Sequence, residues 1–436
     1  MHHKRRLWAL LFALMLVLAA CGGGEVDTGD DDGGDDDAGQ ASGPIDVAAV
    51  WTGGEQENFE AVLDAFTEET GVETTYRPTG DDVGAFLGTQ IEGGSPPDVA
   101  MLPQAGLLRD LAGEGSLTPA GEDVQAAMAE HFSPDWTELG SVDGELYGVY
   151  FKAANKSTWW YNTAVFEQAG VEPPTTWDEM LEAAGTVNAS GTPFVSIGGG
   201  DGWTLTDWFE NIYIQTAGPE MYDQLATHEI PWTDESVIEA LEVFAQLVGD
   251  EANIAGGTAG ALQTDFPTSV QQVFANPPEA ATVYEGDFVA GVITGETNAA
   301  EGDYDFFNFP PVGDAGAAVV GGGDVAVALS DEPGAQELLA FLATPEAAEV
   351  WASAGGFTSP NQSLDTSVYP DDLTRRSAEA VAGADTFRFD LSDLQPAQFG
   401  GTVGKGLFLR FQDFLQNPDD PQAAAQALEK DAKRAF

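Results

Sequence analysis

The sequence predicts an α/β protein of two domains, in which parallel sheets are covered by helices. Short apolar runs alternate with amphipathic helical patterns along most of the chain. The roughly 390 residues that follow the N-terminal segments are large for one domain and suit two. Apolar residues make up 43% of the 436-residue chain, and its single cysteine excludes an intramolecular disulfide, so the fold must rest on its hydrophobic cores.

Residues 1–20 predict a secretory signal peptide. The basic stretch His2–Arg6 precedes an apolar run from Leu7 to Leu18, which is too short for a hydrocarbon core that takes about 20 residues. The following Leu18–Cys21 (LAAC) resembles the lipobox of bacterial lipoproteins, which implies cleavage before Cys21 and lipid on that residue. We therefore expect an extracytoplasmic lipoprotein anchored to the cell membrane through Cys21. The alternative is an ordinary signal peptide with a chance cysteine.

Residues 21–43 predict a disordered acidic tether behind the lipidated cysteine. They are rich in Gly and Asp and cannot bury enough apolar surface to fold. A metal-binding acidic tract is the alternative. Elsewhere His131 and His228 stand alone without ligand spacing, so we expect neither a metal site nor a cofactor.

The charge balance limits the partners of the chain. There are 73 acidic and 15 basic residues, for a formal net charge of −58, and no Lys or Arg occurs between Lys156 and Arg375. Such a chain cannot neutralise phosphates, which excludes nucleic acid, and its field opposes anionic ligands. Self-repulsion on this scale is screened in concentrated salt, so we expect adaptation to a saline environment.

The first elements follow in a β-α-β order. The apolar run at 45–50 predicts a buried strand, and residues 72–77 and 98–102 predict two further strands. Between the first two, Thr52–Glu55 has the spacing of a capping box, and Gly71 ends the helix that it starts. The apolar face of this helix consists of Phe59, Val62, Leu63 and Phe66.

Later elements continue this alternation. Thr176–Glu179 is a second capping box, and Thr344–Glu346 starts a helix with Pro at its first position. Apolar runs at 317–320 and 325–329 predict two buried strands around a Gly-rich turn. Trp159, Trp160, Trp177 and Trp351 lie in helix or strand patterns and are expected in the core.

Several motifs stand in the order typical of one family. They are Trp51–Glu55 after the first strand, Ser95–Val99, Leu146–Tyr150, Trp160–Asn162, Pro173–Glu179 (PPTTWDE) and Tyr284–Phe288. This arrangement resembles the extracytoplasmic sugar-binding proteins of ABC importers, the group that includes maltose-binding proteins. Residues 202–241 are similar to the branch that binds α-glucosides such as trehalose, maltose or sucrose.

The resemblance implies a periplasmic-binding-protein-like fold of two lobes that close around a ligand. It implies an N-terminal lobe of residues 44–147 plus 311–354 and a C-terminal lobe of residues 148–310 plus 355–436. Three hinge crossings are then expected near 147–150, 307–312 and 355–360. The expected partners are a small carbohydrate and the transmembrane subunits of an ABC permease, and the protein is expected to be a monomer without enzymatic activity.

A sugar offers hydroxyl groups and an apolar face of C–H bonds, so its site needs polar side chains and aromatic rings. Residues of these types follow the ends of predicted strands or lie in the family's motifs. The candidate ligand-binding residues are Trp51, Glu55, Gln104, Lys152, Asn155, Asp201, Trp203, Trp208, Glu285, Asp287, Phe288, Asp324 and Phe357.

Some of these candidates have a second interpretation. Lys152 either contacts ligand or balances a buried carboxylate. The loop 198–203 (GGGDGW) lacks the Lys and Ser/Thr of a phosphate-binding loop, and is either a sugar-contacting loop or a plain turn. Phe288 stands where the family commonly has tryptophan, which leaves its stacking role open. Gly321–Gly323 would let backbone approach the ligand beside Asp324.

Two other functions remain as alternatives. The acidic field would suit a cationic ligand, such as a polyamine or a peptide, in the same fold. A secreted glycoside hydrolase also uses carboxylates and aromatic residues. In a chain with 73 acidic residues, however, two carboxylates at a suitable spacing occur by chance and are no evidence for a catalytic pair.

Overall fold

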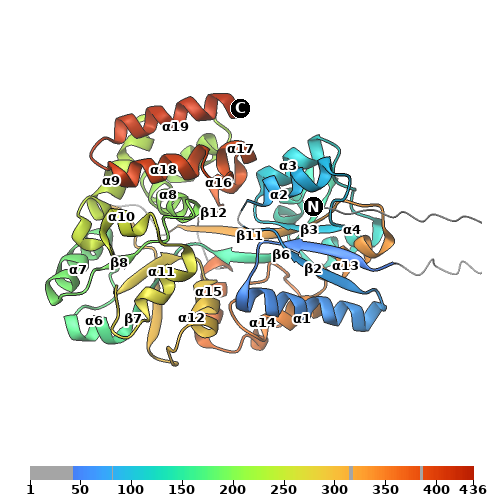
Figure 1. Cartoon of the computed structure of the whole chain (residues 1–436), viewed down its shortest axis with the longest axis horizontal. Helices are drawn as coiled ribbons and strands as arrows, with labels where there is room; N and C mark the ends of the chain where they lie inside the picture. The colour runs from blue at the N-terminus through green and yellow to red at the C-terminus, as the bar shows by residue number, and fades with distance from the viewer. Residues whose placement is uncertain (1–42, 81, 314–317, 383–385) are drawn as a thin grey trace, which may run out of the picture. The chain divides into compact units, whose positions relative to one another are not determined.

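The computed structural model describes residues 43–80, 82–313, 318–382 and 386–436 (Figure 1). The predicted signal peptide, the lipidation site Cys21 and the tether up to residue 42 lie outside these ranges. Within them, no helix combines the length and the apolar character that crossing a membrane requires.

The larger of two main sheets has six strands. Its order is β12-β11-β3-β1-β2, and β6 also pairs with β11. The strands are β1 (Ile45–Ala49), β2 (Thr74–Pro78), β3 (Val99–Leu102), β6 (Gly148–Asn155), β11 (Val319–Ala328) and β12 (Phe387–Phe389). β1 pairs in parallel with both β2 and β3, as the β-α-β order of the sequence predicts. β11 runs antiparallel to β3 and β6.

Helices cover both faces of this sheet, because its strands β1, β3, β6 and β11 are largely buried on both sides. One face carries α1 (Gly53–Thr70), α4 (Glu122–His131), α13 (Pro333–Leu342) and α14 (Pro345–Ala352). The other carries α2 (Val83–Glu92) and α3 (Ala105–Gly113). The predicted inner face of α1, from Phe59 to Phe66, is fully buried, and Gly71 ends that helix in a left-handed conformation. The short α5 (Pro134–Leu139) and the hairpin β4 (Ser141–Val142) and β5 (Glu145–Leu146) precede β6.

The smaller sheet has four strands in the order β10-β7-β9-β8. These are β7 (Thr158–Asn162), β8 (Val195–Ser196), β9 (Thr282–Glu285) and β10 (Tyr304–Asn308). Neighbouring residues of β7 point to opposite faces, as the two-residue period of a strand requires. Trp159 packs into one core and Trp160 into the other, and both are buried as predicted, together with Trp177 and Trp351.

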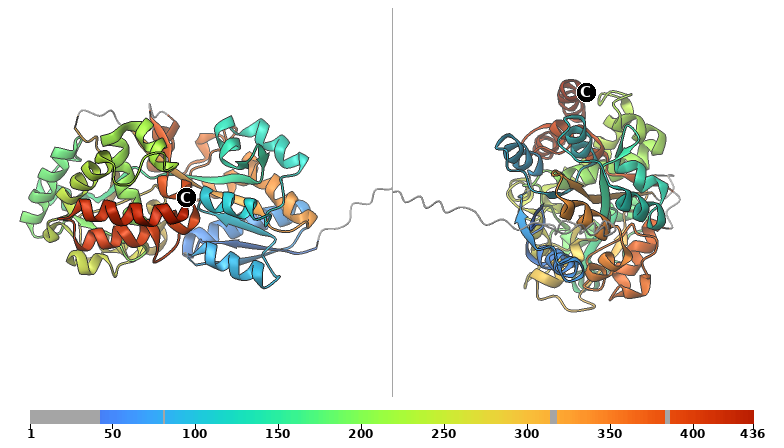
Figure 2. Two further views of the ribbon diagram at one scale, coloured as in Figure 1. Left: turned by 90° about the horizontal axis from the view of Figure 1, so that it is seen from above. Right: turned by 90° about the vertical axis from the view of Figure 1, so that its right-hand side faces the viewer.

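Most helices of the second half surround this smaller sheet. On the Trp159 side lie α6 (Thr163–Ala169), α7 (Trp177–Ser190), α8 (Trp203–Ala226), α9 (Glu235–Val248), α18 (Gly406–Gln416) and α19 (Pro421–Ala435). On the Trp160 side lie α11 (Phe266–Val273) and α12 (Val289–Glu296). Figure 2 shows α18 and α19, in red, lying along the green and yellow helices α8 and α9. The remaining helices are α10 (Gly257–Ala261), α15 (Asp372–Ala382), α16 (Leu391–Leu394) and α17 (Ala397–Gly400).

The chain passes between the two sheets more than once. It leaves the larger sheet after β6 and enters the smaller one at β7, and it returns between β10 and β11. In Figure 1, β6 and β11 run across the middle of the molecule between the two groups of helices. Near the third expected crossing, the Ala153 N–H of β6 donates to the Thr358 carbonyl. The exact lobe boundaries stay a prediction.

One prediction about β11 is wrong. The two strands expected around a turn at Gly321–Gly323 are a single strand, and the three glycines are part of it. The antiparallel strand β6 lies so close that a Cβ on Gly323 would stand 2.7 Å from the Lys152 carbonyl oxygen. The glycines therefore serve close strand packing rather than a turn, and the register shifts only between Asp324 and Val325.

The two predicted capping boxes differ in outcome. Thr176 caps α7 by accepting from the Glu179 N–H at 3.2 Å, as expected. Thr52 precedes α1 at the predicted position, but its side chain makes no capping hydrogen bond. The side chain of Glu55, the other residue of that box, forms an ion pair with Lys152.

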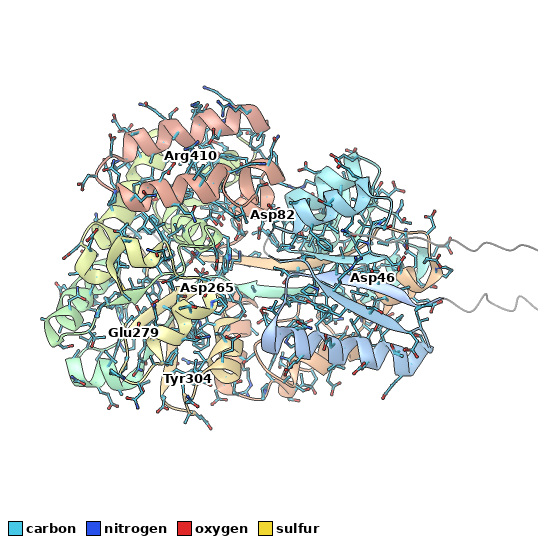
Figure 3. The ribbon with its side chains drawn as sticks, viewed as in Figure 1. Asp46, Asp82, Asp265, Glu279, Tyr304 and Arg410 are labelled. Atoms are coloured by element: carbon cyan, nitrogen blue, oxygen red, sulfur yellow. The ribbon has the colours of Figure 1, made fainter. Side chains whose placement is uncertain are left out.

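Some of the many acidic side chains cap the N-termini of helices. Asp82 accepts from the Ala85 N–H at 2.9 Å and Asp265 from the Thr268 N–H at 2.8 Å. Figure 3 labels both side chains, at the starts of α2 and α11. A carboxylate there satisfies a free N–H group and interacts favourably with the positive end of the helix dipole.

Candidate functional site

A pocket with a cavity volume of about 240 Å³ lies beside β6 and β11, between α1 and helices packed on the smaller sheet. It includes the segments that follow β1 and β3, at the carboxyl ends of parallel strands, where open α/β sheets bind ligands. Eight of the predicted site residues line it: Trp51, Glu55, Gln104, Lys152, Asp201, Trp203, Phe288 and Asp324.

Aromatic rings form one wall of the pocket. Trp203, the first residue of α8, lies with its ring centroid 5.4 Å from that of Phe266 and 6.0 Å from that of Phe288. Trp51 also lines the pocket; it is 4% exposed and packs edge-on against Trp351 at 4.9 Å. Such a wall suits the apolar face of a sugar ring.

Lys152 is buried next to the aromatic residues of the pocket, with its ammonium 5.8 Å from the centre of the Phe288 ring. It forms an ion pair with Glu55, and only 4% of its side chain is exposed. Burial lowers the pKa of Lys152, but the carboxylates of Glu55 and Asp324 outweigh this effect and raise it overall. Burial in turn raises the pKa of Asp324 to about 6. Lys152 therefore balances the carboxylates of Glu55 and Asp324 and lies in the pocket lining, and its contact with a ligand stays a prediction.

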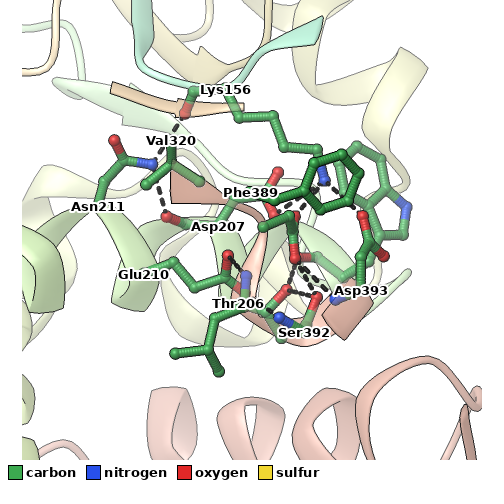
Figure 4. A network of polar contacts seen from close by, with 12 residues as sticks. Lys156, Thr206, Asp207, Glu210, Asn211, Val320, Phe389, Ser392 and Asp393 are labelled. Atoms are coloured by element: carbon green, nitrogen blue, oxygen red, sulfur yellow. Dashed lines mark hydrogen bonds and ion pairs between the residues drawn. The ribbon is translucent and has the colours of Figure 1, made fainter. Parts of the chain in front are cut away.

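Lys156 is the centre of a second buried charge cluster (Figure 4). Its ammonium pairs with Asp390, with Asp207 at 3.4 Å and with Asp393 at 3.7 Å. Lys156 and Asp393 line the pocket, and the Lys156 ammonium lies 5.8 Å from the centre of the Trp203 ring. This cluster therefore connects the pocket wall to the core beneath α8.

Burial and Lys156 divide the carboxyl groups of this cluster into two classes. Burial opposes ionisation of Asp390, yet the Lys156 ammonium and local hydrogen bonds lower its pKa to about 2. Burial raises the pKa of Asp207 to about 8 and those of Glu210 and Asp393 well above the ordinary range. One ionised pair among protonated neighbours is the arrangement that a buried site with a single cation permits.

The same cluster contains a geometric candidate for a metal. Oxygens of Asp207, Glu210 and Asp390 lie within 4.8 Å of one another, the only such group among the described residues. However, the Lys156 ammonium already pairs with two of the three carboxylates. The backbone N–H groups of Leu391 and Ser392 donate to the third, Glu210. These contacts supply the positive charge and the donors that a cation would otherwise provide.

Carboxyl groups outnumber ammonium groups in the pocket lining. Glu55, Asp201, Glu296, Asp324 and Asp393 contribute carboxyl groups to the lining. One oxygen of Asp201 also accepts from the Phe266 N–H at 2.6 Å, which fixes α11 against the loop before α8. The pocket therefore favours ligands that donate hydrogen bonds, as hydroxyl groups do.

Five of the predicted site residues lie outside the pocket lining, buried beneath it or in the cores. Asn155, Trp208, Glu285, Asp287 and Phe357 are each at most 5% exposed. Trp208 packs against Trp159 and Phe244, and Phe357 packs against Trp351. Asp287 accepts from the hydroxyl groups of Thr358 and Ser377. Their residue types match those of a sugar site, but each points into the protein rather than into the pocket.

Several lining residues were not among the candidates. They include Pro103, Lys156, Phe266, Glu296, Asp393 and Phe408. Lys156 is next to the predicted candidates and one of two basic residues in a long acidic stretch, which was a usable signal. Phe266, Glu296 and Phe408 come from helices far apart in the sequence, and no local pattern marks them.

The sequence is similar to a known family and to characterised relatives. The family model described as bacterial extracellular solute-binding protein matches residues 51–349. The osmoprotective compounds-binding protein GgtB of Synechocystis sp. is 36% identical over 94% of this chain and 96% of its own. The alpha-glucosides-binding periplasmic protein AglE of Rhizobium meliloti is 34% identical over 86% of this chain and 84% of its own.

The fold is similar to that of solved solute receptors. The bacterial solute receptor AcbH superposes with a TM-score of 0.78 at 20% identity, over 91% of this chain and all of that one. These comparisons confirm the predicted resemblance and the two-lobed α/β fold. The prediction of a binding protein rather than an enzyme is confirmed as well, by the family and the relatives.

Proposed function

The chain belongs to the family of bacterial extracellular solute-binding proteins, and we propose that it captures an uncharged α-glucoside such as trehalose, maltose or sucrose. Its place is outside the cytoplasm, as the solute-binding component of an ABC sugar importer. In this proposal the two lobes close over the sugar and deliver it to the permease.

The observation that carries the proposal is a pocket with an aromatic wall, whose two lysines are already paired with carboxylates of the protein. Trp203, Phe266 and Phe288 supply rings for the apolar face of a sugar. Lys152 and Lys156, the only basic residues of the lining, are paired with the half-buried Glu55 and the buried Asp390, respectively. An anionic ligand would therefore meet no free cation, whereas hydroxyl groups would meet several carboxyl acceptors.

The relatives support the ligand class. One is named for osmoprotective compounds and the other for α-glucosides, and both align over most of their length. An uncharged sugar that serves as an osmoprotectant satisfies both names. It also fits a protein with a formal net charge of −58, which is suited to a saline environment.

The anchor and the assembly state belong to the same proposal. Cys21 carries lipid and holds the protein at the cell membrane, and residues 22–43 act as a tether. The protein works as a monomer of two lobes, with the boundaries given above. Expression of a Cys21→Ala variant in a bacterial host tests the anchor: the variant should leave the membrane fraction, and retention there would contradict it.

One alternative ligand class has an observation in its favour. The five carboxyl groups of the pocket lining suit a cationic ligand such as a polyamine or a basic peptide. The two lysines oppose it, because each already supplies positive charge to this site.

A thermal-shift screen separates these ligands. The soluble form from Gly43 onward would be heated in high salt with trehalose, maltose, sucrose, glucose, spermidine or a peptide mixture. A ligand at 100 times its Kd adds about 2.7 kcal/mol of stability. A shift with an α-glucoside supports the proposal, and a shift with spermidine or peptides alone would overturn the ligand while keeping the fold.

A further inference from the structure

The ammonium group of Lys152 lies among three aromatic rings. It is 5.0 Å from the centre of the Trp351 ring, 5.6 Å from that of Trp51 and 5.8 Å from that of Phe288. All three distances are within the range of cation–π attraction. Lys152 itself is 3% exposed, so water screens these contacts little.

Carboxyl groups from three elements complete this arrangement. Glu55 of α1 forms the ion pair with Lys152, and Asp324 of β11 stands opposite Lys152 in the strand register. Asp287, after β9, also acts on the Lys152 ammonium electrostatically. We call these three carboxyl groups and the three rings the ammonium cage.

Rings and carboxyl groups around one point are what proteins use to bind the ammonium group of a ligand. Four cage members, Trp51, Glu55, Phe288 and Asp324, also line the pocket. The cage therefore opens toward the ligand, and a side chain of the protein fills the position that a ligand cation would take.

We propose that Lys152 determines specificity by filling the ammonium cage, which excludes amines and quaternary ammonium compounds and reserves the pocket for uncharged ligands. This inference rests on the proposed sugar-binding function and deepens it. A ligand cation that enters the pocket meets the Lys152 charge and finds the rings and carboxyl groups already engaged. A sugar needs only acceptors and an apolar surface, and it meets no such penalty.

The test opens the cage and supplies a free cation. Melting temperatures of the wild type and of Lys152→Ala are measured in tetramethylammonium chloride, n-butylammonium chloride and sodium chloride at equal ionic strength. We expect no ammonium-specific shift in the wild type. In Lys152→Ala we expect a saturable rise, with binding at least tenfold tighter than to the wild type.

Two matched variants control for general destabilisation and for surface charge. Adding Glu55→Gln to Lys152→Ala should weaken ammonium binding at least tenfold, because the main carboxylate of the cage is gone. Lys433→Ala, which removes an exposed lysine paired with Glu429, should behave as the wild type. If Lys152→Ala does not fold in sodium chloride, recovery on refolding in n-butylammonium chloride is the equivalent readout.

The outcomes separate this inference from the proposed function. Ammonium binding by the wild type, or no ammonium effect on Lys152→Ala in either readout, overturns the role of Lys152. Trehalose, maltose and sucrose titrations of the wild type test the sugar proposal by themselves. If the wild type binds none of these sugars but Lys152→Ala binds ammonium ions, the role of Lys152 in the cage is supported and the sugar proposal is rejected.

Discussion

Replacement of Lys156 by methionine removes the one cation of the cluster beneath α8. Methionine keeps most of the side-chain volume, so the change mainly removes charge. Asp390 is fully buried and loses its ion-pair partner, and the carboxyl groups of Asp207 and Asp393 lose their contact with the Lys156 ammonium. No other lysine or arginine pairs with these three carboxylates among the described residues, so nothing nearby replaces the lost charge.

The magnitude follows from the burial of the pair. Breaking a buried ion pair by removing one partner costs about 3–5 kcal/mol, since the other charge stays buried and uncompensated. Unfolding entropy of about 2.1 cal/mol/K per residue gives roughly 0.8 kcal/mol/K for a chain of about 390 residues, hence a fall of about 4–6 °C in Tm.

The loss should also depend on pH. In the wild type the lowered pKa of Asp390, about 2, keeps its stabilising contribution present throughout pH 5–8 and loses it only in stronger acid. Without Lys156, burial raises the pKa of Asp390, so its ionisation destabilises the variant more as the pH rises. The difference in Tm between the two proteins should therefore be larger at pH 8 than at pH 5.

Differential scanning calorimetry in high salt at both pH values measures this difference. Lys433→Met is the matched control, because Lys433 is 67% exposed and its ion pair with Glu429 should contribute little. A loss below about 1 kcal/mol at pH 8, or a loss that is the same at both pH values, would refute the assignment of Lys156 as the compensating cation.

Four further predictions follow from the structure. Trp203→Ala should raise the Kd for the sugar at least about fivefold, or about 1 kcal/mol, and an unchanged Kd by calorimetry would remove Trp203 from the site. Burial raises the pKa of Asp207 to about 8, so the native state holds this proton and loses stability as the pH rises from about 4 to about 8. The Tm of Asp207→Asn should therefore fall less over that pH range than the Tm of the wild type. The same pH profile for both proteins would contradict this. A Cβ on Gly106 would stand 1.8 Å from the Gln395 carbonyl oxygen, so Gly106→Ala should destabilise by about 1–3 kcal/mol in urea unfolding, whereas a neutral result would mean that α3 does not pack there. Screening of the acidic surface should raise the wild-type Tm between about 0.05 M and about 2 M NaCl, and a flat salt dependence would count against adaptation to salt.

The sequence predicts this fold well because local patterns and global packing agree. The strands β1 and β3 and the buried face of α1 follow from their apolar residues, and β2 follows from its position after Gly71, which ends that helix. Periodicity failed at Gly321–Gly323, where glycine has two opposite uses. Glycine permits a tight turn, and it also permits the close approach of a neighbouring strand such as β6. Only the long-range pairing of β11 with β6 shows which of these applies.

The site was predictable only where ligand-facing residues follow a strand or start a helix. Trp51 and Gln104 each lie two residues after the end of β1 and β3, and Trp203 ends the Gly-rich stretch 198–203 that precedes the rest of α8, so sequence position pointed to them. Trp208 is one and a half turns further along α8, where the helix faces the core. Residue type alone did not separate these two tryptophans, because aromatic rings serve both sugar stacking and core packing.

The measurement that tests the account most directly is isothermal titration calorimetry of the soluble form from Gly43 onward with trehalose, maltose and sucrose in high salt. We predict saturable 1:1 binding of at least one of them, with a Kd that is no weaker in about 2 M than in about 0.5 M NaCl, because the ligand carries no charge. No binding of any α-glucoside, together with salt-sensitive binding of spermidine, would contradict it.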